Sequence, residues 1–269
     1  MRRACRIAPV LFAAATPQHT ANAQHAQIPA NEKPIALFNG VDLKGWEGNI
    51  ARFWSVANGA IVAKNNPADP LGPSSFLLTE TRHKDFRLLC EVRLVKHWCH
   101  SGIAFRGRRF EYTPDPEQWP LERHAYQGPL LVVPGAAKNT VYGIFELYRR
   151  SWNEDAGNRA GGDGNWLVNI GDAGGVGSAH GWNRIELLCK GSRVRVALNG
   201  VEILDWIEPS PELIDAGPIG LQMHYVPIGE ETEVHFRDLV ISTCEQPGDN
   251  LITVDNGRQP LAAHDTSTP

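Results

Sequence analysis

The sequence predicts an all-β protein organised as a single β-sandwich, and residues 181–206 carry most of that prediction. Every second residue is apolar along 185–189 and again along 194–198, with a Lys-Gly-Ser break between the two runs. A period of two residues is typical of antiparallel strands that have one buried face. Asn199-Gly200 supplies a second tight turn, because both residue types tolerate a positive φ. Three successive strands joined by short turns predict a β-meander.

The same pattern recurs along the rest of the chain. Residues 54–63 predict a hairpin, because Asn58-Gly59 separates two apolar runs. The segment 86–94 alternates cleanly, with Phe86 and every second residue after it on one face. Further strands are expected at 75–79, 101–106, 141–147, 219–224 and 233–241. The glycine-rich stretch 151–181 predicts a long loop, and ten or more strands without a change in character favour one sandwich over two domains.

Composition narrows the classes of partner. The chain has 269 residues, of which 42% are hydrophobic and 21% are charged, as in an ordinary globular protein. A net charge of −4 gives no reason to expect nucleic acid or an anionic membrane surface as a partner. After the first residues, no apolar run approaches the length of a membrane span, so membrane insertion is not expected.

The first residues resemble an export signal. A basic start, an apolar run at 10–15 and an Ala-Asn-Ala pattern at 21–23 predict a bacterial signal peptide over residues 1–24. The protein is then expected in the periplasm or outside the cell; a disordered N-terminal tail is the alternative. The other expected parts are a linker (25–34), the sandwich (35–243) and a flexible C-terminal tail (244–269).

Four cysteines remain if the signal peptide is removed: Cys90, Cys99, Cys189 and Cys244. In an oxidising compartment they could form two disulfides, with three connectivities open. Two of them, Cys90 and Cys189, fall in the apolar phase of strands, which favours buried free thiols. No Cys-x-x-Cys pair is present, so a structural zinc site has no support.

Several polar side chains fall within strands rather than in turns. Gln222 and His224 share one phase, opposite Leu221 and Met223. In a jelly roll, polar residues of one phase on neighbouring strands converge on the concave face of a sheet. A cleft lined by such groups suits a polyhydroxylated ligand, because each hydroxyl needs a donor and an acceptor. Taken singly, each residue could instead belong to a solvated strand face. The candidates are Glu91, Arg106, Tyr126, Gln127, Glu146, Gln222 and His224.

Seven short motifs occur in order between Ile35 and Ser242. They are Leu37–Trp46, Trp54–Gly59, Ser101–Arg106, Gly181–Glu186, Leu198–Gly200, Gly217–His224 and Phe236–Leu239. Together they resemble the 3-keto-disaccharide hydrolase domain family. The resemblance implies a concanavalin-like jelly-roll β-sandwich, commonly exported by bacteria, that acts on glycosides oxidised at C3 of the sugar.

The implied chemistry starts from the acidity that a C3 ketone gives to the hydrogen on C2. A base removes this proton, and the enolate expels the C1 aglycone by β-elimination; addition of water then gives net hydrolysis. The site needs a base, an electrophile for the enolate oxygen and an acid for the leaving group. A divalent metal cation or an arginine could be the electrophile, and no organic cofactor is expected.

The resemblance also implies roles for individual residues. His224 is expected to be the base or a metal ligand, assisted by one of two carboxylates. These carboxylates are Glu146 and Glu91. Arg106 is expected to bind the ketone or a hydroxyl. The other expected substrate-binding residues are Gln127, which matches the glutamine of the family's Gly-Tyr-Gln segment, Tyr126 and Gln222.

The chain departs from the family pattern after this glutamine. Family members commonly continue as Tyr-Gln-x-Asp, whereas this chain has Gly128-Pro129 after Gln127 and no carboxylate before Glu146. Two hypotheses therefore stay open. One is an enzyme that cleaves 3-keto-glycosides by hydrolysis or elimination. The other is a non-catalytic carbohydrate-binding β-sandwich that kept the cleft and lost the chemistry.

Overall fold

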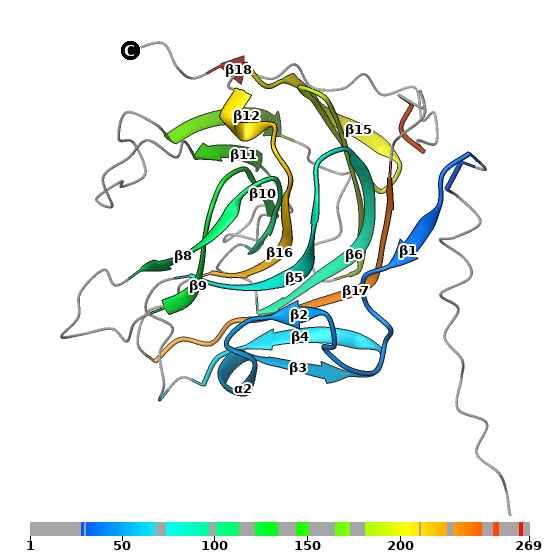
Figure 1. Ribbon diagram of the computed structural model, residues 1–269. Coiled ribbons are helices and arrows are strands. Elements are labelled where there is room, and N and C mark those ends of the chain that lie inside the picture. Colours follow the sequence, from blue (N-terminus) through cyan, green and yellow to red (C-terminus); the bar gives the residue numbers. More distant parts are fainter. Residues whose placement is uncertain are drawn as a thin grey trace, which may run out of the picture.

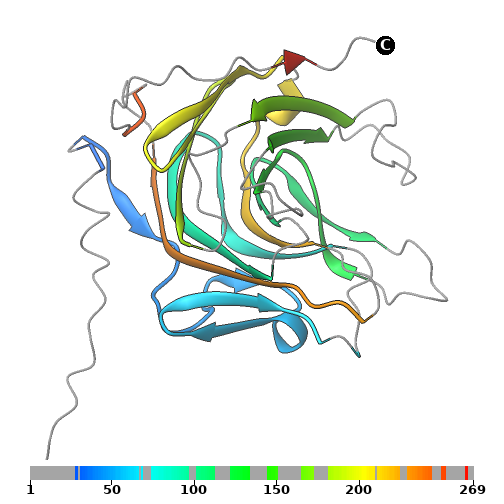
Figure 2. The same cartoon turned by 180° about the vertical axis from the view of Figure 1, so that it is seen from behind.

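The fold is a sandwich of two antiparallel sheets (Figure 1). The computed structural model describes residues 28–29, 31–66, 68, 74–96, 101–112, 122–133, 144–150, 165–172, 181–209, 211–224, 229–243, 250–252 and 264–265. Two sheets of eight strands, called sheet A and sheet B below, pack face to face. A two-stranded hairpin lies on the outer side of sheet B, the side that faces away from sheet A (Figures 1 and 2). The expected all-β sandwich is confirmed.

The strand order defines the two sheets. Sheet A consists of β15 (Val201–Ile207), β14 (Arg193–Leu198), β13 (Asn183–Lys190), β6 (Phe86–Lys96), β17 (Glu233–Thr243), β4 (Ala60–Lys64) and β3 (Trp54–Ala57), with β1 (Pro34–Ala36) paired to β17. Sheet B consists of β18 (His264–Asp265), β12 (Asn165–Asp172), β11 (Ile144–Arg150), β10 (Leu130–Val133), β7 (Ser101–Ala104), β16 (Gly217–Met223), β5 (Ser75–His83) and β2 (Trp46–Glu47). The hairpin consists of β8 (Arg108–Tyr112) and β9 (Glu122–Gln127). Among the residues that the structure describes, the helical elements are α2 (Ile50–Phe53) and the 3₁₀ turn η1 (Pro211–Leu213).

The predicted meander is present as β13, β14 and β15. Leu187 lies opposite Val196, as the shared apolar phase requires. The turn after β14 has φ values of 50° at Asn199 and 83° at Gly200, which explains the residue types found there. One expectation was wrong: the stretch 151–181 contains strand β12, which pairs with β11. The many glycines of this stretch led to the expectation of a loop, although the apolar residues between Trp166 and Ile170 could have indicated a strand.

The core lies between the two sheets. Along β6, every second side chain from Phe86 to Leu94 is fully buried in the main apolar cluster. Sheet B contributes Ile103, Leu131 and Leu221 to the same cluster. Because successive residues of a strand point to opposite faces, the alternate positions form an outer face on each sheet. Candidate polar residues on these strands therefore belong to one of two outer faces.

The described cysteines are buried free thiols. Cys90 and Cys189 have no exposed surface, and burial raises the pKa of the Cys90 thiol well above its usual range. This confirms the favoured alternative for these two residues, while Cys99 and Cys244 lie outside the described residues.

We expect Cys90 and Cys189 to resist a thiol reagent in the native protein, because both side chains are buried and the raised pKa of Cys90 also suppresses its reactive thiolate. Both should react fully in denaturant. Mass spectrometry of the labelled peptides would measure this. Equal labelling of the Cys90 peptide with and without denaturant would contradict the buried position.

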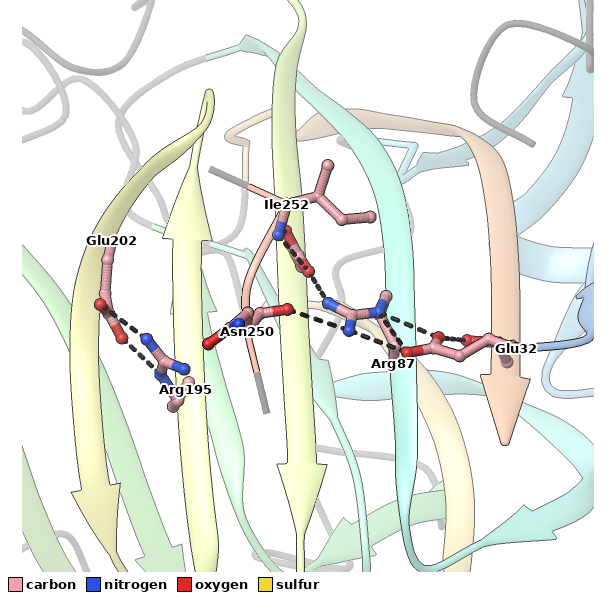
Figure 3. A network of polar contacts seen from close by, with 8 residues as sticks. Glu32, Arg87, Arg195, Glu202, Asn250 and Ile252 are labelled. Atoms are coloured by element: carbon pink, nitrogen blue, oxygen red, sulfur yellow. Dashed lines mark hydrogen bonds and ion pairs between the residues drawn. The ribbon is translucent and has the colours of Figure 1, made fainter. Parts of the chain in front are cut away.

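The outer face of sheet A holds a buried charge network around Arg87 (Figure 3). The Arg87 guanidinium pairs with Glu32 at 2.9–3.2 Å and with Glu186, and it donates to the carbonyl of Asn250 at 3.1 Å. The amide of Ile252 donates to both Glu186 oxygens at 2.9 and 3.0 Å. Burial raises the pKa of Glu186, although the Ile252 amide and Arg87 offset part of that effect.

This network ties the segments 28–32 and 250–252 to sheet A. Leu251 packs on Leu188 and Ala197, and Ile28 packs on Leu89 and Val240. Parts of the expected linker (25–34) and tail (244–269) are therefore packed against sheet A. The expected signal peptide (1–24) lies outside the described residues.

Candidate functional site

Strand β16 places Gln222 on the outer face of sheet B, the face that is turned away from sheet A. Ile219, Leu221 and Met223 point into the core, so the alternate position of Gln222 faces the other way. His224 follows the strand directly, continues the phase of Gln222 and is partly exposed. Figure 1 shows sheet B curving around this side. The two residues therefore share the concave side that the sequence predicted for them.

Gln222 has unmet hydrogen-bonding capacity although it is 2% exposed. Its Nε2 lies 3.5 Å from Ser74 Oγ, and its Oε1 is buried with no hydrogen-bond partner among the residues that the structure describes. The backbone is held by Ser101 Oγ, which donates to the Gln222 carbonyl at 2.7 Å. A buried acceptor without a partner costs about 1–3 kcal/mol. A hydroxyl of a bound ligand could remove that cost.

Tyr126 attaches the β8–β9 hairpin to this face. Its ring lies 5.5 Å from that of Phe76, the residue opposite Gln222 on β5, and its hydroxyl donates to the carbonyl of Phe105. Tyr126 is 1% exposed and belongs to a small apolar cluster on the outer face. The other members are Phe76, Leu78, Ala104, Leu130 and Val132. The expected substrate-binding tyrosine thus contributes packing close to Gln222.

Gln127 lies at the end of the same hairpin. Its Oε1 accepts from Arg108 Nε and Nη2 at 3.3 and 3.1 Å across the two strands. The contact is exposed, so the Gln127 side chain is accessible at the margin of the hairpin.

Arg106 occupies a different place from the one its expected role requires. It has a φ of 55°, is 1% exposed, and donates to the Lys84 carbonyl at 2.7 Å and to Asp85 at 3.1 Å. It packs by the start of β16 at Gly217, whereas His224 is seven residues further along. At about 3.3 Å per residue, this separation is about 23 Å. The structure therefore does not bring Arg106 close to His224. Instead, the Arg106 side chain stabilises the turn between β5 and β6.

Glu91 lies on the opposite side of the sandwich. It is on the outer face of sheet A, where it pairs with Arg237 at 2.6–2.7 Å. The Arg237 guanidinium lies 4.0 Å above the Trp182 ring. Both sheets therefore separate Glu91 from His224. The residues share an outward phase on their strands, but the sequence does not reveal which sheet each strand joins.

Glu146 is the expected carboxylate that shares sheet B with Gln222. The register places Gln222 opposite Gly102, Gly102 opposite Val132, and Val132 opposite Glu146. These three steps across sheet B span about 14 Å, because neighbouring strands lie about 4.8 Å apart. One cross-strand row therefore contains both a candidate substrate-binding residue and a candidate catalytic residue.

The described residues contain no complete ligand set for the expected divalent cation. Within the described ranges, no three or more His, Cys, Asp or Glu residues gather in a way that could hold a metal ion. No helix among the same residues is long and apolar enough to cross a membrane. His224 as a metal ligand therefore stays a prediction.

The chain is similar to one family model and to a number of solved structures. A family model described as a 3-keto-alpha-glucoside-1,2-lyase-like domain matches residues 33–242. A putative glycosyl hydrolase from Parabacteroides distasonis ATCC 8503 is 18% identical, with 79% of this chain and 94% of that chain covered and a TM-score of 0.49. The carbohydrate-binding module CBM66 from Bacillus subtilis is 12% identical, with 74% and 96% covered and a TM-score of 0.50, so the two chains share a fold. No curated protein matches the chain.

Proposed function

Because the chain belongs to the 3-keto-alpha-glucoside-1,2-lyase-like domain family, we propose that it cleaves 3-keto-glycosides at the outer face of sheet B. The observation that carries this proposal is the placement of Gln222 and His224 together on that face, beside the hairpin that Tyr126 anchors. The partner is a glycoside or oligosaccharide. We place the reaction outside the cytoplasm, on the basis of the signal peptide predicted over residues 1–24.

In the proposed mechanism, His224 is the base. In its neutral form, the imidazole accepts the proton from C2 of the 3-keto sugar. The electron pair moves into the ketone to form an enolate. When the ketone reforms, the C1–O bond breaks and the aglycone leaves and takes up a proton. Elimination stops at the unsaturated sugar, whereas addition of water to C1 completes hydrolysis.

The remaining roles follow from position. Gln222 would bind a sugar hydroxyl through its unmet amide oxygen, and Glu146 is the candidate acid for the leaving aglycone because it shares the cross-strand row. A divalent cation, when bound, would supply an electrophile for the enolate oxygen. No step is assigned to it, because the described side chains do not form its ligand set.

A non-catalytic sugar-binding domain is the second candidate function. One sequence difference favours it: this chain has Pro129 at the position where family members commonly carry an aspartate. The Pro129 carbonyl accepts from the amide of Phe105 at 3.1 Å. Gly128 before it has a φ of 147°, and a Cβ there would lie 2.6 Å from the Gly107 Cα. This segment is thus used for packing.

Incubation with a 3-keto-glucoside that carries a chromogenic aglycone would distinguish these functions. We expect the wild type to release the aglycone, and the mass of the sugar product separates elimination from hydrolysis. A rate that exhaustive EDTA treatment leaves unchanged would remove the metal from the reaction. Sugar binding by calorimetry without any release would instead establish the binding domain.

A further inference from the structure

Gly102 lies beneath the side chain of Gln222. It occupies the middle of the row on β7, between Gln222 on β16 and Val132 on β10. A Cβ built on Gly102 would lie 2.9 Å from Gln222 Oε1 and 2.7 Å from Leu130 Cδ1. Both distances are shorter than real Cβ contacts. The side chains of Gln222 and Leu130 therefore close over the backbone of β7 in space that only a glycine leaves.

The backbone of Gln222 cannot move away to restore that space. Its carbonyl accepts the 2.7 Å hydrogen bond from Ser101 Oγ, and β16 is paired on both sides, with Phe76 and Gly102 opposite Gln222. A side chain at position 102 would thus be accommodated by rotation of the Gln222 or Leu130 side chain. Rotation of Gln222 would carry its amide oxygen away from its present position.

We infer that Gly102 is a positioning residue that holds the Gln222 amide at the depth where its oxygen can accept a hydrogen bond from a hydroxyl of the 3-keto sugar. This inference rests on the proposed function of the outer face of sheet B. Gly102 would affect the sugar only through Gln222. Its substitution should therefore weaken substrate binding in the ground state and leave the proton transfer at His224 intact. Loss of one hydrogen bond should raise KM, and the Kd of the sugar, about three- to tenfold with kcat nearly unchanged.

Gly220 provides a matched control for Gly102→Ala. It lies on the same outer face. The three atoms nearest to its Cβ would be Leu78 Cδ2 at 2.7 Å, Ala104 Cβ at 2.9 Å and Phe76 Cδ1 at 3.6 Å, so Gln222 is not among the crowded neighbours. Gly220→Ala therefore introduces similar crowding into the same sheet. The test compares Gly102→Ala, Gly220→Ala, Gln222→Ala and the double variant Gly102→Ala/Gln222→Ala. Measured quantities are kcat, KM, the calorimetric Kd of a 3-keto-glucoside and the melting temperature.

We expect Gly102→Ala to raise KM and Kd, Gly220→Ala to change neither, and the double variant to match Gln222→Ala. An equal rise in both glycine variants, an unchanged Kd in Gly102→Ala, or additive losses in the double variant would overturn the role of Gly102. In each case an active wild type would leave the proposed function standing. A wild type that neither binds nor cleaves the sugar would overturn both. If it binds without cleaving, the Kd series decides the role of Gly102.

Discussion

Replacing His224 with alanine is expected to lower kcat/KM for a 3-keto-glucoside by about 10²–10⁴-fold, the usual contribution of a positioned general base. The melting temperature should stay near that of the wild type, because His224 follows β16 and lies on the outer face of sheet B rather than in the core. Initial rates of aglycone release, measured beside thermal unfolding curves, would test both statements.

His235→Ala is the control for this substitution. His235 is also partly exposed, but it lies on the outer face of sheet A, with its Nε2 2.7 Å from Glu233 and its Nδ1 3.0 Å from Arg93. Its loss should leave kcat/KM unchanged. Full activity in His224→Ala, or equal losses in the two variants, would contradict the assignment of the site to sheet B.

Replacing Arg87 with alanine is expected to lower the free energy of unfolding by about 3–5 kcal/mol, the usual effect of breaking a buried ion pair. The substitution leaves the carboxylates of Glu32 and Glu186 buried without their cation, and it removes the hydrogen bond to Asn250. The loss should be larger at pH 8 than at pH 5. Burial already raises the pKa of Glu186, and without Arg87 it rises further, so the folded variant binds more protons than the unfolded chain and loses stability as pH rises.

Arg193→Ala supplies the comparison on the same sheet. Arg193 pairs with Asp205 at 2.6–2.7 Å, but the two side chains are 41% and 39% exposed. Such surface pairs contribute about 0–1 kcal/mol. Urea unfolding of both variants would measure the difference. Similar losses for Arg87→Ala and Arg193→Ala would contradict a stabilising role of the Arg87 network in Figure 3.

The fold could be predicted from the sequence because its signals are local. Alternation along β6 and β13 and the turns at Asn58 and Asn199 each depend on neighbouring residues only, and the structure confirms them. Strand β12 was missed because glycines surround it. The packed segments near Ile28 and Leu251 were missed because isolated apolar residues in a polar stretch give no periodic signal.

The site was less predictable because it depends on which strands join which sheet. Gln222 lies on β16 and His224 directly follows this strand, so their shared face could be predicted from their spacing. Glu91 and Glu146 have similar local patterns, yet they belong to different sheets. The role of Gly102 depends on the approach of Gln222 from a strand more than a hundred residues away, which a single sequence does not contain.

The central claim is that the C3 ketone makes cleavage possible at the outer face of sheet B. The most direct test compares the release of one chromogenic aglycone from a 3-keto-glucoside and from the same glucoside without the ketone, with wild-type protein. The account predicts release from the ketone alone, because only the ketone acidifies the C2 hydrogen. Equal release from both glucosides, or from neither, would contradict it.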